Sequence, residues 1–328
     1  MPKRSAAGRS PLRLTASVWM RKSAPGWKIG CAKPSNSFLP VMEMEKTMQI
    51  IHSPEALHSV CAEWRRQGLK TALVPTMGYL HEGHASLITK AVSLCDRVVA
   101  SVFVNPVQFS PNEDLASYPR DFKHDCELLE KNGCAMVFHP TPEVMYAPDF
   151  STWIVPEHLN EGLCGKTRPI HFKGVCTVVG KLFNIVQPDK AFFGQKDAQQ
   201  AAIVERMVRD LNFDVEIVRC PIVREASGLA KSSRNTYLSD KEKEAALVLS
   251  RAVAKGEALC KAGETDVATI IRAMKAVIED EPLAKIDYVE AVDAATIEPV
   301  TTVRPGTLFA MAVYIGKTRL IDNFVYAG

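Results

Sequence analysis

The sequence lacks the features of several protein classes. It contains no uninterrupted apolar run of about 18 residues, so neither a membrane-spanning helix nor a membrane partner is expected. None of its nine cysteines forms a Cys-x-x-Cys pair, and their number is odd. This distribution argues against a disulfide framework and a zinc site, and it indicates reduced thiols in a cytoplasmic protein.

Negative charge is missing from the N-terminal segment, since residues 1–42 contain no Asp or Glu. Residues 1–47 hold nine Lys/Arg and two Glu, a charge of +7, whereas the whole chain has +3, so residues 48–328 carry −4. This slightly acidic remainder argues against a nucleic-acid partner. The basic segment is either an organelle transit peptide or a stretch before a start at Met42, Met44 or Met48. In both cases we expect a disordered extension.

The rest of the chain alternates strand and helix patterns, and a length of 328 residues suggests two domains. Helices are expected at 54–67, 83–94, 122–132, 175–186 and 198–211, and strands at 49–51, 71–75, 97–104, 135–138, 190–193 and 215–219. This α/β order predicts a Rossmann-like, doubly wound parallel sheet over residues 48–221. Its ligand should lie at the carboxyl ends of the strands.

The pattern changes after about Pro221. The sequence SDKE at 239–242 predicts a capping box that opens a helix. A second helix is expected at 266–279, and strands at 286–292, 307–314 and 318–323. Residues 222–328 are therefore predicted to form a smaller α+β C-terminal domain.

Two histidines mark the first candidate site. The segment 76–84 (TMGYLHEGH) joins a predicted strand to a predicted helix. Such a junction presents free backbone N–H groups and the positive end of a helix dipole, which favour phosphate. His81 and His84 can donate to phosphate oxygens there as charge develops. The His-x-Gly-His pattern is typical of enzymes that transfer nucleotidyl groups; the alternative is a pair of solvent-facing histidines.

A glutamine marks the second candidate site. Gln108 follows the predicted strand 97–104, so it should lie at the carboxyl edge of the sheet. Its amide can donate and accept hydrogen bonds to a hydroxylated substrate without adding charge. An ordinary loop glutamine is the alternative.

The third candidate site is the segment 193–200 (FGQKDAQQ), again at a strand-to-helix junction. Gly194 allows close backbone approach, and Lys196 can reach a phosphate. Gln200 lies one helical turn beyond Lys196 on the same face. Asp197 could cap the helix or contact a ribose. The alternative is a plain capped helix with a solvated lysine.

The fourth candidate site is the donor-rich segment 228–235 (GLAKSSRN), which suits a polyphosphate. It resembles the Lys-Met-Ser-Lys-Ser loop of class I aminoacyl-tRNA synthetases. A mobile loop of this kind can close over ATP, so the segment is a candidate lid. A solvated interdomain loop is the alternative.

These four segments, in this order, resemble the pantothenate synthetase (pantoate–β-alanine ligase) family of the His-x-Gly-His nucleotidyltransferase superfamily. The resemblance runs from about Met48 to the end of the chain. It includes further blocks at 118–120 (YPR), 168–175 (RPIHFKGV), 181–184 (KLFN) and 320–323 (LIDN). It implies that ATP drives the condensation of pantoate with β-alanine through a pantoyl adenylate, releasing AMP and pyrophosphate. It also implies Mg²⁺ with the ATP, and a homodimer.

The resemblance also implies roles for individual residues. His81 and His84 would contact the ATP phosphates, with His84 as proton donor, and Lys196 and Arg234 would complete the catalytic set. Gln108 and Gln200 would hold pantoate, and Gln108 would help to place β-alanine. The residues expected around ATP are Met77, Gly78, His81, Gly83, His84, Gly194, Gln195, Lys196, Asp197, Val223, Lys231, Ser232, Ser233 and Arg234.

Two positions depart from the family pattern. Lys231 stands where relatives commonly have an apolar residue, so this extra cation either strengthens ATP binding or points to solvent. His124 stands where relatives often have an acid, which leaves Asp125 as the candidate Mg²⁺ contact.

Three alternative functions are open. Another His-x-Gly-His adenylyltransferase would not need the pair Gln108 and Gln200. A class I tRNA synthetase would be longer and more basic. A non-catalytic nucleotide-binding module would not need the intact set of His81, His84 and Lys196.

Overall fold

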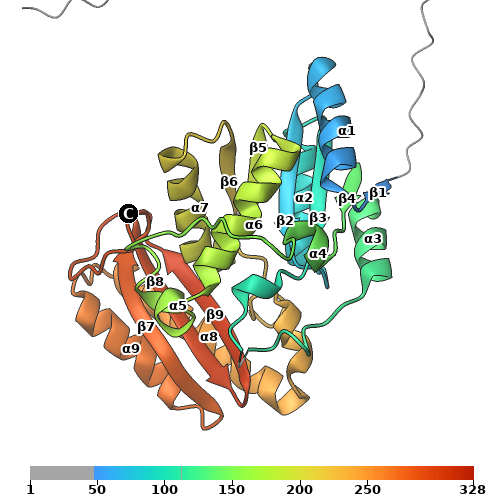
Figure 1. Ribbon diagram of the computed structural model, residues 1–328. Helices are drawn as coiled ribbons and strands as arrows, with labels where there is room; N and C mark the ends of the chain where they lie inside the picture. The colour runs from blue at the N-terminus through green and yellow to red at the C-terminus, as the bar shows by residue number, and fades with distance from the viewer. Residues whose placement is uncertain (1–47, 112) are drawn as a thin grey trace, which may run out of the picture. The chain divides into compact units, whose positions relative to one another are not determined.

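The computed structural model describes residues 48–111 and 113–328, which belong to one compact unit (Figure 1). It contains a six-stranded parallel sheet and a three-stranded antiparallel sheet. The predicted fold class is therefore confirmed. The predicted extension over residues 1–47 lies outside the described residues. A domain boundary between residues 221 and 222 stays a prediction.

The first sheet arises from strand–helix repeats. The strands are β1 (Gln49–Ile51), β2 (Thr71–Thr76), β3 (Arg97–Val102), β4 (Met136–Phe138), β5 (Lys190–Gly194) and β6 (Glu216–Cys220). The longer helices between them are α1 (Pro54–Arg66), α2 (Glu82–Val92), α3 (Phe122–Lys131), α6 (His171–Val186) and α7 (Ala198–Asp210). Short helical segments are η1 (Pro106–Gln108), α4 (Pro142–Met145), α5 (Leu163–Thr167) and η2 (Gln195–Asp197).

The strand order of the first sheet is β1-β4-β3-β2-β5-β6. The chain winds in one direction from β2 to β4 and in the other direction from β5 to β6, so the order reverses between β2 and β5. These two strands pair directly, with Ala72 opposite Lys190 and Leu73 opposite Ala191. Ligands of open α/β sheets bind at the carboxyl ends of the strands beside such a reversal.

Helices cover both faces of this sheet, so its central strands β2 and β3 are buried on both sides. Along β2, Leu73 packs into the core that α1, α6 and α7 share. Its neighbours Ala72 and Val74 pack with α2 and α3 on the opposite face. This alternation follows from the two-residue period of a strand. The sheet is therefore the rigid platform from which the loops at its edge extend.

The C-terminal residues build a second, smaller layer. It comprises η3 (Ser233–Tyr237), α8 (Asp240–Lys261), α9 (Val267–Glu279), β7 (Ala284–Asp293), β8 (Thr307–Ile315) and β9 (Thr318–Val325). The predicted capping box is confirmed, since Ser239 and Glu242 bond reciprocally at the start of α8. α8 and α9 pack on one face of the antiparallel sheet. On its other face, Leu308 and Ala310 join the core that contains α6 and α7.

Two predicted features differ in detail. α6 begins at His171 rather than Val175; this start is hard to find in the sequence, because Ile170 makes no side-chain capping bond. The donor-rich segment is not an open loop, because Ser233–Tyr237 form a 3₁₀ helix. The eight cysteines of the described segments are free thiols. Within residues 48–111 and 113–328, no helix combines the length and the apolar character that crossing a membrane requires.

Candidate active site at the carboxyl edge of the parallel sheet

The loop after β2 is held by a buried carboxylate. Gly78 and Tyr79 both have left-handed backbone angles, with φ of +85° and +51°. Asp125 of α3 accepts hydrogen bonds from the amides of Tyr79 (2.9 Å) and Leu80 (2.6 Å). A Cβ added to Gly78 would lie 3.0 Å from the Asp125 carboxylate, which explains the glycine there. Asp125 therefore shapes the loop that leads to the histidines.

The buried position of Asp125 bears on its predicted contact with Mg²⁺. Its side chain is almost completely buried, and burial raises its pKa although the two backbone bonds oppose this shift. Both carboxylate oxygens already accept amide hydrogens. A magnesium ion would have to share these oxygens, so the metal contact stays a prediction.

The two histidines build the start of α2. His81 is the N-cap residue, and its Nδ1 accepts from the amide of Gly83 at 3.1 Å. His84 Nδ1 accepts from the amide of His81 at 3.3 Å. Because a nitrogen that accepts carries no proton, this network assigns the proton of each neutral ring to Nε2. The pair therefore offers two Nε2–H donors, with ring centroids 4.2 Å apart.

Both imidazoles are held neutral. Burial, with a smaller contribution from the Lys196 charge, lowers the pKa of His81 to about 4. Burial and the neighbouring His81 and Lys196 lower the pKa of His84 well below its usual value. Neutral rings can donate hydrogen bonds to phosphate oxygens without a full charge in the site.

The loop after β5 carries the lysine and is fixed by the second sheet. Asn323 of β9 donates to the carbonyl oxygens of Gln195 and Lys196, both at 3.0 Å. The Gln195 side chain donates back to Asn323 at 3.2 Å, so it turns towards β9. Asp197 is the N-cap residue of α7, yet its side chain makes no capping bond. Of its two predicted roles, contact with a ribose is the one left open.

Gln108 sits in a buried polar network beyond β3. Asn105 donates to its Oε1 at 3.0 Å and to the carbonyl of Gly174 at 3.1 Å. Tyr146 donates to Asn105 Oδ1 at 2.9 Å. With its oxygen engaged, Gln108 has its Nε2 directed at Met77 Sδ (3.0 Å). The amide of Gln108 is therefore oriented in advance, with its NH₂ group facing the loop after β2.

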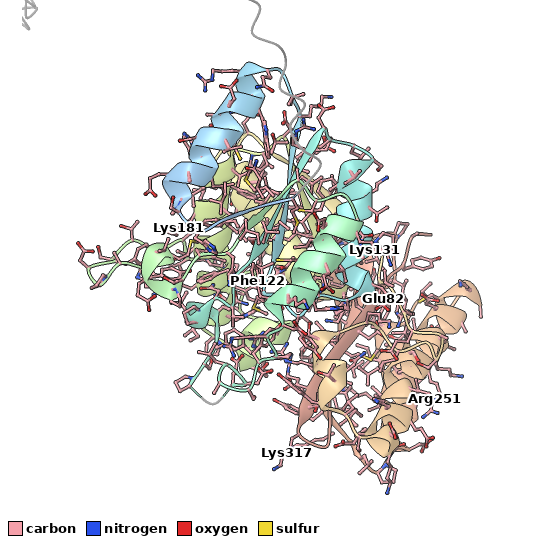
Figure 2. The ribbon with its side chains drawn as sticks, turned by 90° about the vertical axis from the view of Figure 1, so that its right-hand side faces the viewer. Glu82, Phe122, Lys131, Lys181, Arg251 and Lys317 are labelled. Atoms are coloured by element: carbon pink, nitrogen blue, oxygen red, sulfur yellow. The ribbon has the colours of Figure 1, made fainter. Side chains whose placement is uncertain are left out.

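The donor-rich segment is tied to both neighbouring loops. Ser233 Oγ donates to the carbonyl of Tyr79 at 3.1 Å. Arg234 makes a bidentate pair with Asp114, with distances of 2.9 and 2.8 Å. Lys231 pairs with Glu82 at 3.1 Å, so the extra cation has a partner in the protein, and its effect on ATP binding stays a prediction. Figure 2 shows Glu82 on the side of the molecule where α2 approaches the C-terminal layer.

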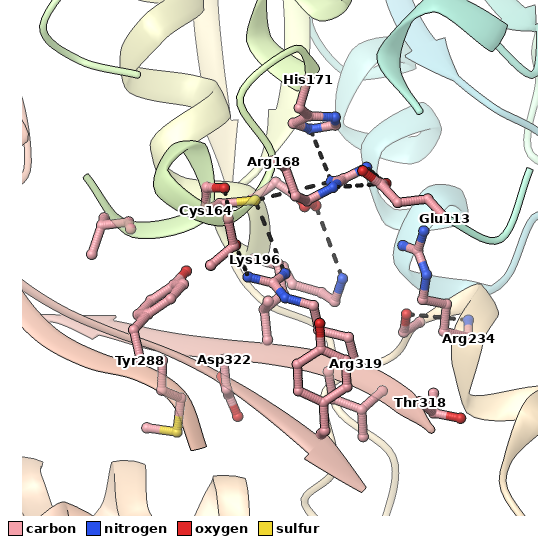
Figure 3. A pocket seen from close by; sticks show the side chains of 18 of the residues that line it. Glu113, Cys164, Arg168, His171, Lys196, Arg234, Tyr288, Thr318, Arg319 and Asp322 are labelled. Carbon is pink, nitrogen blue, oxygen red and sulfur yellow. Dashed lines mark hydrogen bonds and ion pairs between the residues drawn. The ribbon is translucent and has the colours of Figure 1, made fainter. Parts of the chain in front are cut away.

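These loops enclose two adjoining cavities. The inner cavity, of about 220 Å³, lies beneath the histidines and Gln108. The outer cavity, of about 1050 Å³, extends across α5 to the second sheet. Both are lined by Arg168, His171, Lys196, Asp197, Gln200, Ser232 and Arg234. Figure 3 shows part of the outer cavity, with Lys196 and Arg234 reaching into it from different elements.

The cavities bring most predicted site residues together. Those that line the inner cavity are Met77, His81, Gly83, His84, Gln108, Gly194, Lys196, Asp197, Gln200, Val223, Lys231, Ser232, Ser233 and Arg234. Gly78, Gln195 and Asp125 do not line it and support its loops instead. Sequence reasoning missed Asn105, Asp114 and Tyr146 as supports. Asn105 carried a signal, because the sequence Asn105-Pro106 directly follows the predicted strand 97–104.

Comparison with known proteins agrees with this geometry. The family described as "Pantoate-beta-alanine ligase" matches residues 49–325. A pantothenate synthetase of Ruminiclostridium cellulolyticum is 54% identical over 281 residues, which are 85% of this chain and 99% of that protein. One from Enterococcus faecalis is 52% identical over 279 residues, again 85% and 99%.

Solved structures give the same result. The pantothenate synthetase of Thermus thermophilus superposes with a TM-score of 0.80 at 41% identity, covering 86% of this chain and 100% of that one. The pantoate–β-alanine ligase of Francisella tularensis, complexed with "Beta-gamma ATP" and β-alanine, has a TM-score of 0.70 at 33% identity, covering 85% and 98%. The chain belongs to the pantoate–β-alanine ligase family.

Proposed function

We propose that this protein is a ligase that joins pantoate to β-alanine at the expense of ATP, forming pantothenate, AMP and pyrophosphate. The observation that carries the proposal is the convergence of two imidazole donors, Lys196 and a pre-oriented Gln108 on one inner cavity. Family membership over residues 49–325 supports it. A different adenylyltransferase would leave the Asn105–Gln108 network without a purpose.

In the first step, a carboxylate oxygen of pantoate bonds to the α-phosphorus of ATP, and the bond from that phosphorus to pyrophosphate breaks. Such transfers depend on positioning and charge stabilisation more than on a protein nucleophile. His81 and His84 donate to phosphate oxygens through Nε2–H, Lys196 adds a point charge, and Ser232 and Arg234 border the same cavity. Because its ring is neutral, His84 is better suited to donate a hydrogen bond to a phosphate oxygen than to transfer a proton to it.

In the second step, the amine nitrogen of β-alanine bonds to the acyl carbon of pantoyl adenylate. The bond from that carbon to the AMP oxygen breaks, and the nitrogen loses its proton. Gln108 and Gln200 hold the pantoyl group for both steps. Exclusion of water protects the reactive acyl adenylate. The segment around Lys231 is our candidate for the lid that supplies this protection.

Mg²⁺ is proposed to enter with ATP. In the described part of the chain, no group of three or more His, Cys, Asp or Glu side chains is placed to hold a metal. The donor set therefore fits an ion that is held mainly by substrate phosphates and water, as is usual for Mg²⁺. When bound, the ion supplies charge neutralisation at the phosphates. A homodimer and a cytoplasmic location are further proposals; light scattering and cell fractionation test them.

The decisive experiment follows pyrophosphate and AMP from the purified full chain with ATP and Mg²⁺. Pantoate alone should release pyrophosphate once per site, and steady AMP turnover should need β-alanine as well. Release with a phosphopantetheine or mononucleotide acceptor, and none with pantoate, would assign the protein to the alternative adenylyltransferases.

Two variants test the assignment of residues. His84→Ala and Lys196→Ala should each slow pyrophosphate release by about 10²–10³, because each removes one positioned donor or cation. The surface variant His158→Ala is the matched control and should keep the wild-type rate. Normal turnover in folded His84→Ala would show that the histidine pair is not part of the site.

A further inference from the structure

Arg168 lies where the inner and outer cavities meet and has no role in the proposed first step. It ends α5, directly before α6, and its side chain is only 14% exposed. It lines both cavities. Figure 3 shows its guanidinium between Glu113, His171 and Cys164. A buried cation at the junction of two cavities is a candidate for binding an anionic group.

Neighbouring side chains fix the guanidinium on one edge. Glu113 Oε2 accepts from Arg168 Nε at 2.9 Å and from Nη2 at 2.5 Å. His171 Nε2 lies 3.2 Å from Arg168 Nη1, and His171 Nδ1 lies 3.1 Å from the Gln108 carbonyl. Burial and the Arg168 charge lower the pKa of His171 to about 3, so its ring is neutral. Nδ1–H therefore donates to Gln108, and Nε2 accepts from Arg168.

The other edge of the guanidinium is poorly satisfied. A guanidinium has five N–H donors, and bidentate binding of a carboxylate uses two of them. Beyond the Glu113 and His171 bonds, Nη2 reaches the Gln108 carbonyl at 3.5 Å and Nη1 reaches Cys164 Sγ at 3.9 Å. Both contacts are long. Two donors on the terminal edge are thus free to hold a stronger acceptor, while Glu113 keeps the group in place.

The reaction supplies a group that needs such a partner. This step rests on the proposed function: the second substrate must place its amine at the acyl carbon beside Gln108, and it carries a carboxylate about 4 Å away along its chain. Lys196 serves the phosphates in the proposed first step, and Lys231 and Arg234 are paired with Glu82 and Asp114. Arg319, which is paired with Asp287 at 2.8 Å, and Lys317 line only the outer cavity and do not reach the inner one. Arg168 is left, and His171 connects it to the backbone of Gln108.

We propose that the terminal edge of Arg168 binds the carboxylate of β-alanine. Glu113 and His171 are positioning residues that hold the guanidinium at a fixed place relative to Gln108. The enzyme would then select an amine that carries a carboxylate and would discriminate against neutral amines of the same length. The discrimination would act in the second step and leave formation of the adenylate untouched.

The test compares β-alanine with β-alaninamide, its neutral amide, as the attacking amine. In Arg168→Gln, we expect the KM for β-alanine to rise about 10- to 100-fold, because a charged hydrogen-bond pair is lost. The wild-type preference for β-alanine over β-alaninamide in kcat/KM should fall by a similar factor. The single release of pyrophosphate with pantoate alone should be unchanged. Arg319→Gln is the matched control and should keep the wild-type preference.

The outcomes separate this inference from the proposed function. Absence of pantoate-dependent pyrophosphate release in the wild type would contradict the proposed function itself. An Arg168→Gln protein with an unchanged preference, or with slowed pyrophosphate release, would overturn the role of Arg168. If Arg168→Gln does not fold, Arg168→Lys decides. A raised KM for β-alanine with intact pyrophosphate release supports the role, and an unchanged KM overturns it.

Discussion

Gly174 is the residue at which a single added methyl should do most damage to catalysis. It lies in the first turns of α6, where the helix passes directly over the Gln108 loop. A Cβ built at Gly174 would lie 2.6 Å from Gln108 Cα and 2.7 Å from both its N and Cβ. Carbon atoms prefer separations of about 3.5–4.0 Å, so Gly174→Ala must push the loop by about 1 Å.

Two effects on stability oppose each other in Gly174→Ala. Alanine favours a helix by about 0.5–1 kcal/mol relative to glycine. Overpacking against a backbone costs about 1–3 kcal/mol. The net loss of stability should therefore lie between about 0 and 2.5 kcal/mol, and the protein should stay folded. Catalysis suffers more, because a misplacement of about 1 Å can cost about 10²-fold in rate.

Gly180 of the same helix is a matched control for this prediction. Its added Cβ would meet Ile154 Cδ1 at 2.5 Å, and that atom is the movable end of a side chain. Gly180→Ala should thus change activity less than about threefold, because the side chain can turn away. Urea unfolding and pyrophosphate release would be measured for both variants. Wild-type kcat/KM in Gly174→Ala, or an equal loss in Gly180→Ala, would refute the reasoning.

Three further predictions concern other parts of the site. Asn323→Ala should lower the free energy of unfolding by about 2–3 kcal/mol in urea titrations, since two loop carbonyls lose their donor. The KM of this variant for ATP should rise because Lys196 is displaced, and an unchanged KM would show that Asn323 does not position Lys196. The free energy of unfolding should fall from pH 6.5 towards 4, by up to about 1.4 kcal/mol per pH unit for each histidine of the pair, because the unfolded chain binds protons that folded His81 and His84 do not. His81→Asn should flatten this decline in unfolding measurements, and an unaltered slope would contradict the lowered pKa of His81. Lys231→Met should raise the KM for ATP less than about fivefold, because a partly exposed ion pair with a neighbouring glutamate already offsets the charge; a tenfold rise would contradict this.

Local patterns predicted the framework well because they act over short distances. Ser53 and Pro54 indicate the start of α1 in the sequence, and in the structure Ser53 Oγ accepts a hydrogen bond from the Ala56 amide at 3.2 Å. The strand pattern at 97–104 corresponds to β3, which is nearly all buried. Loops that follow such strands converge at one edge of a parallel sheet, so candidate site residues could be predicted from the sequence alone.

Partners far apart in the sequence could not be predicted in this way. Asp114 and Arg234 are separated by 120 residues, and Asn323 lies 127 residues from Lys196. Each is an ordinary polar residue in its own segment, and only tertiary packing brings the pairs together. The start of α6 was missed because its N-cap residue, Ile170, makes no side-chain capping bond, so no capping residue marks the start in the sequence.

At the start of α2, the backbone hydrogen bonds of the first helical turn decide which nitrogen of each histidine carries the proton. In many proteins a separate carboxylate selects which ring nitrogen carries the proton. Here the first turn of the helix does so, since backbone amides occupy the Nδ1 atoms of His81 and His84. Folding of this one turn therefore sets the tautomer of both groups, and no further residue has to be maintained for that purpose. Asparagine at either position could imitate the accepting Nδ1 without the donating Nε2, so helix formation and phosphate chemistry can be separated by substitution.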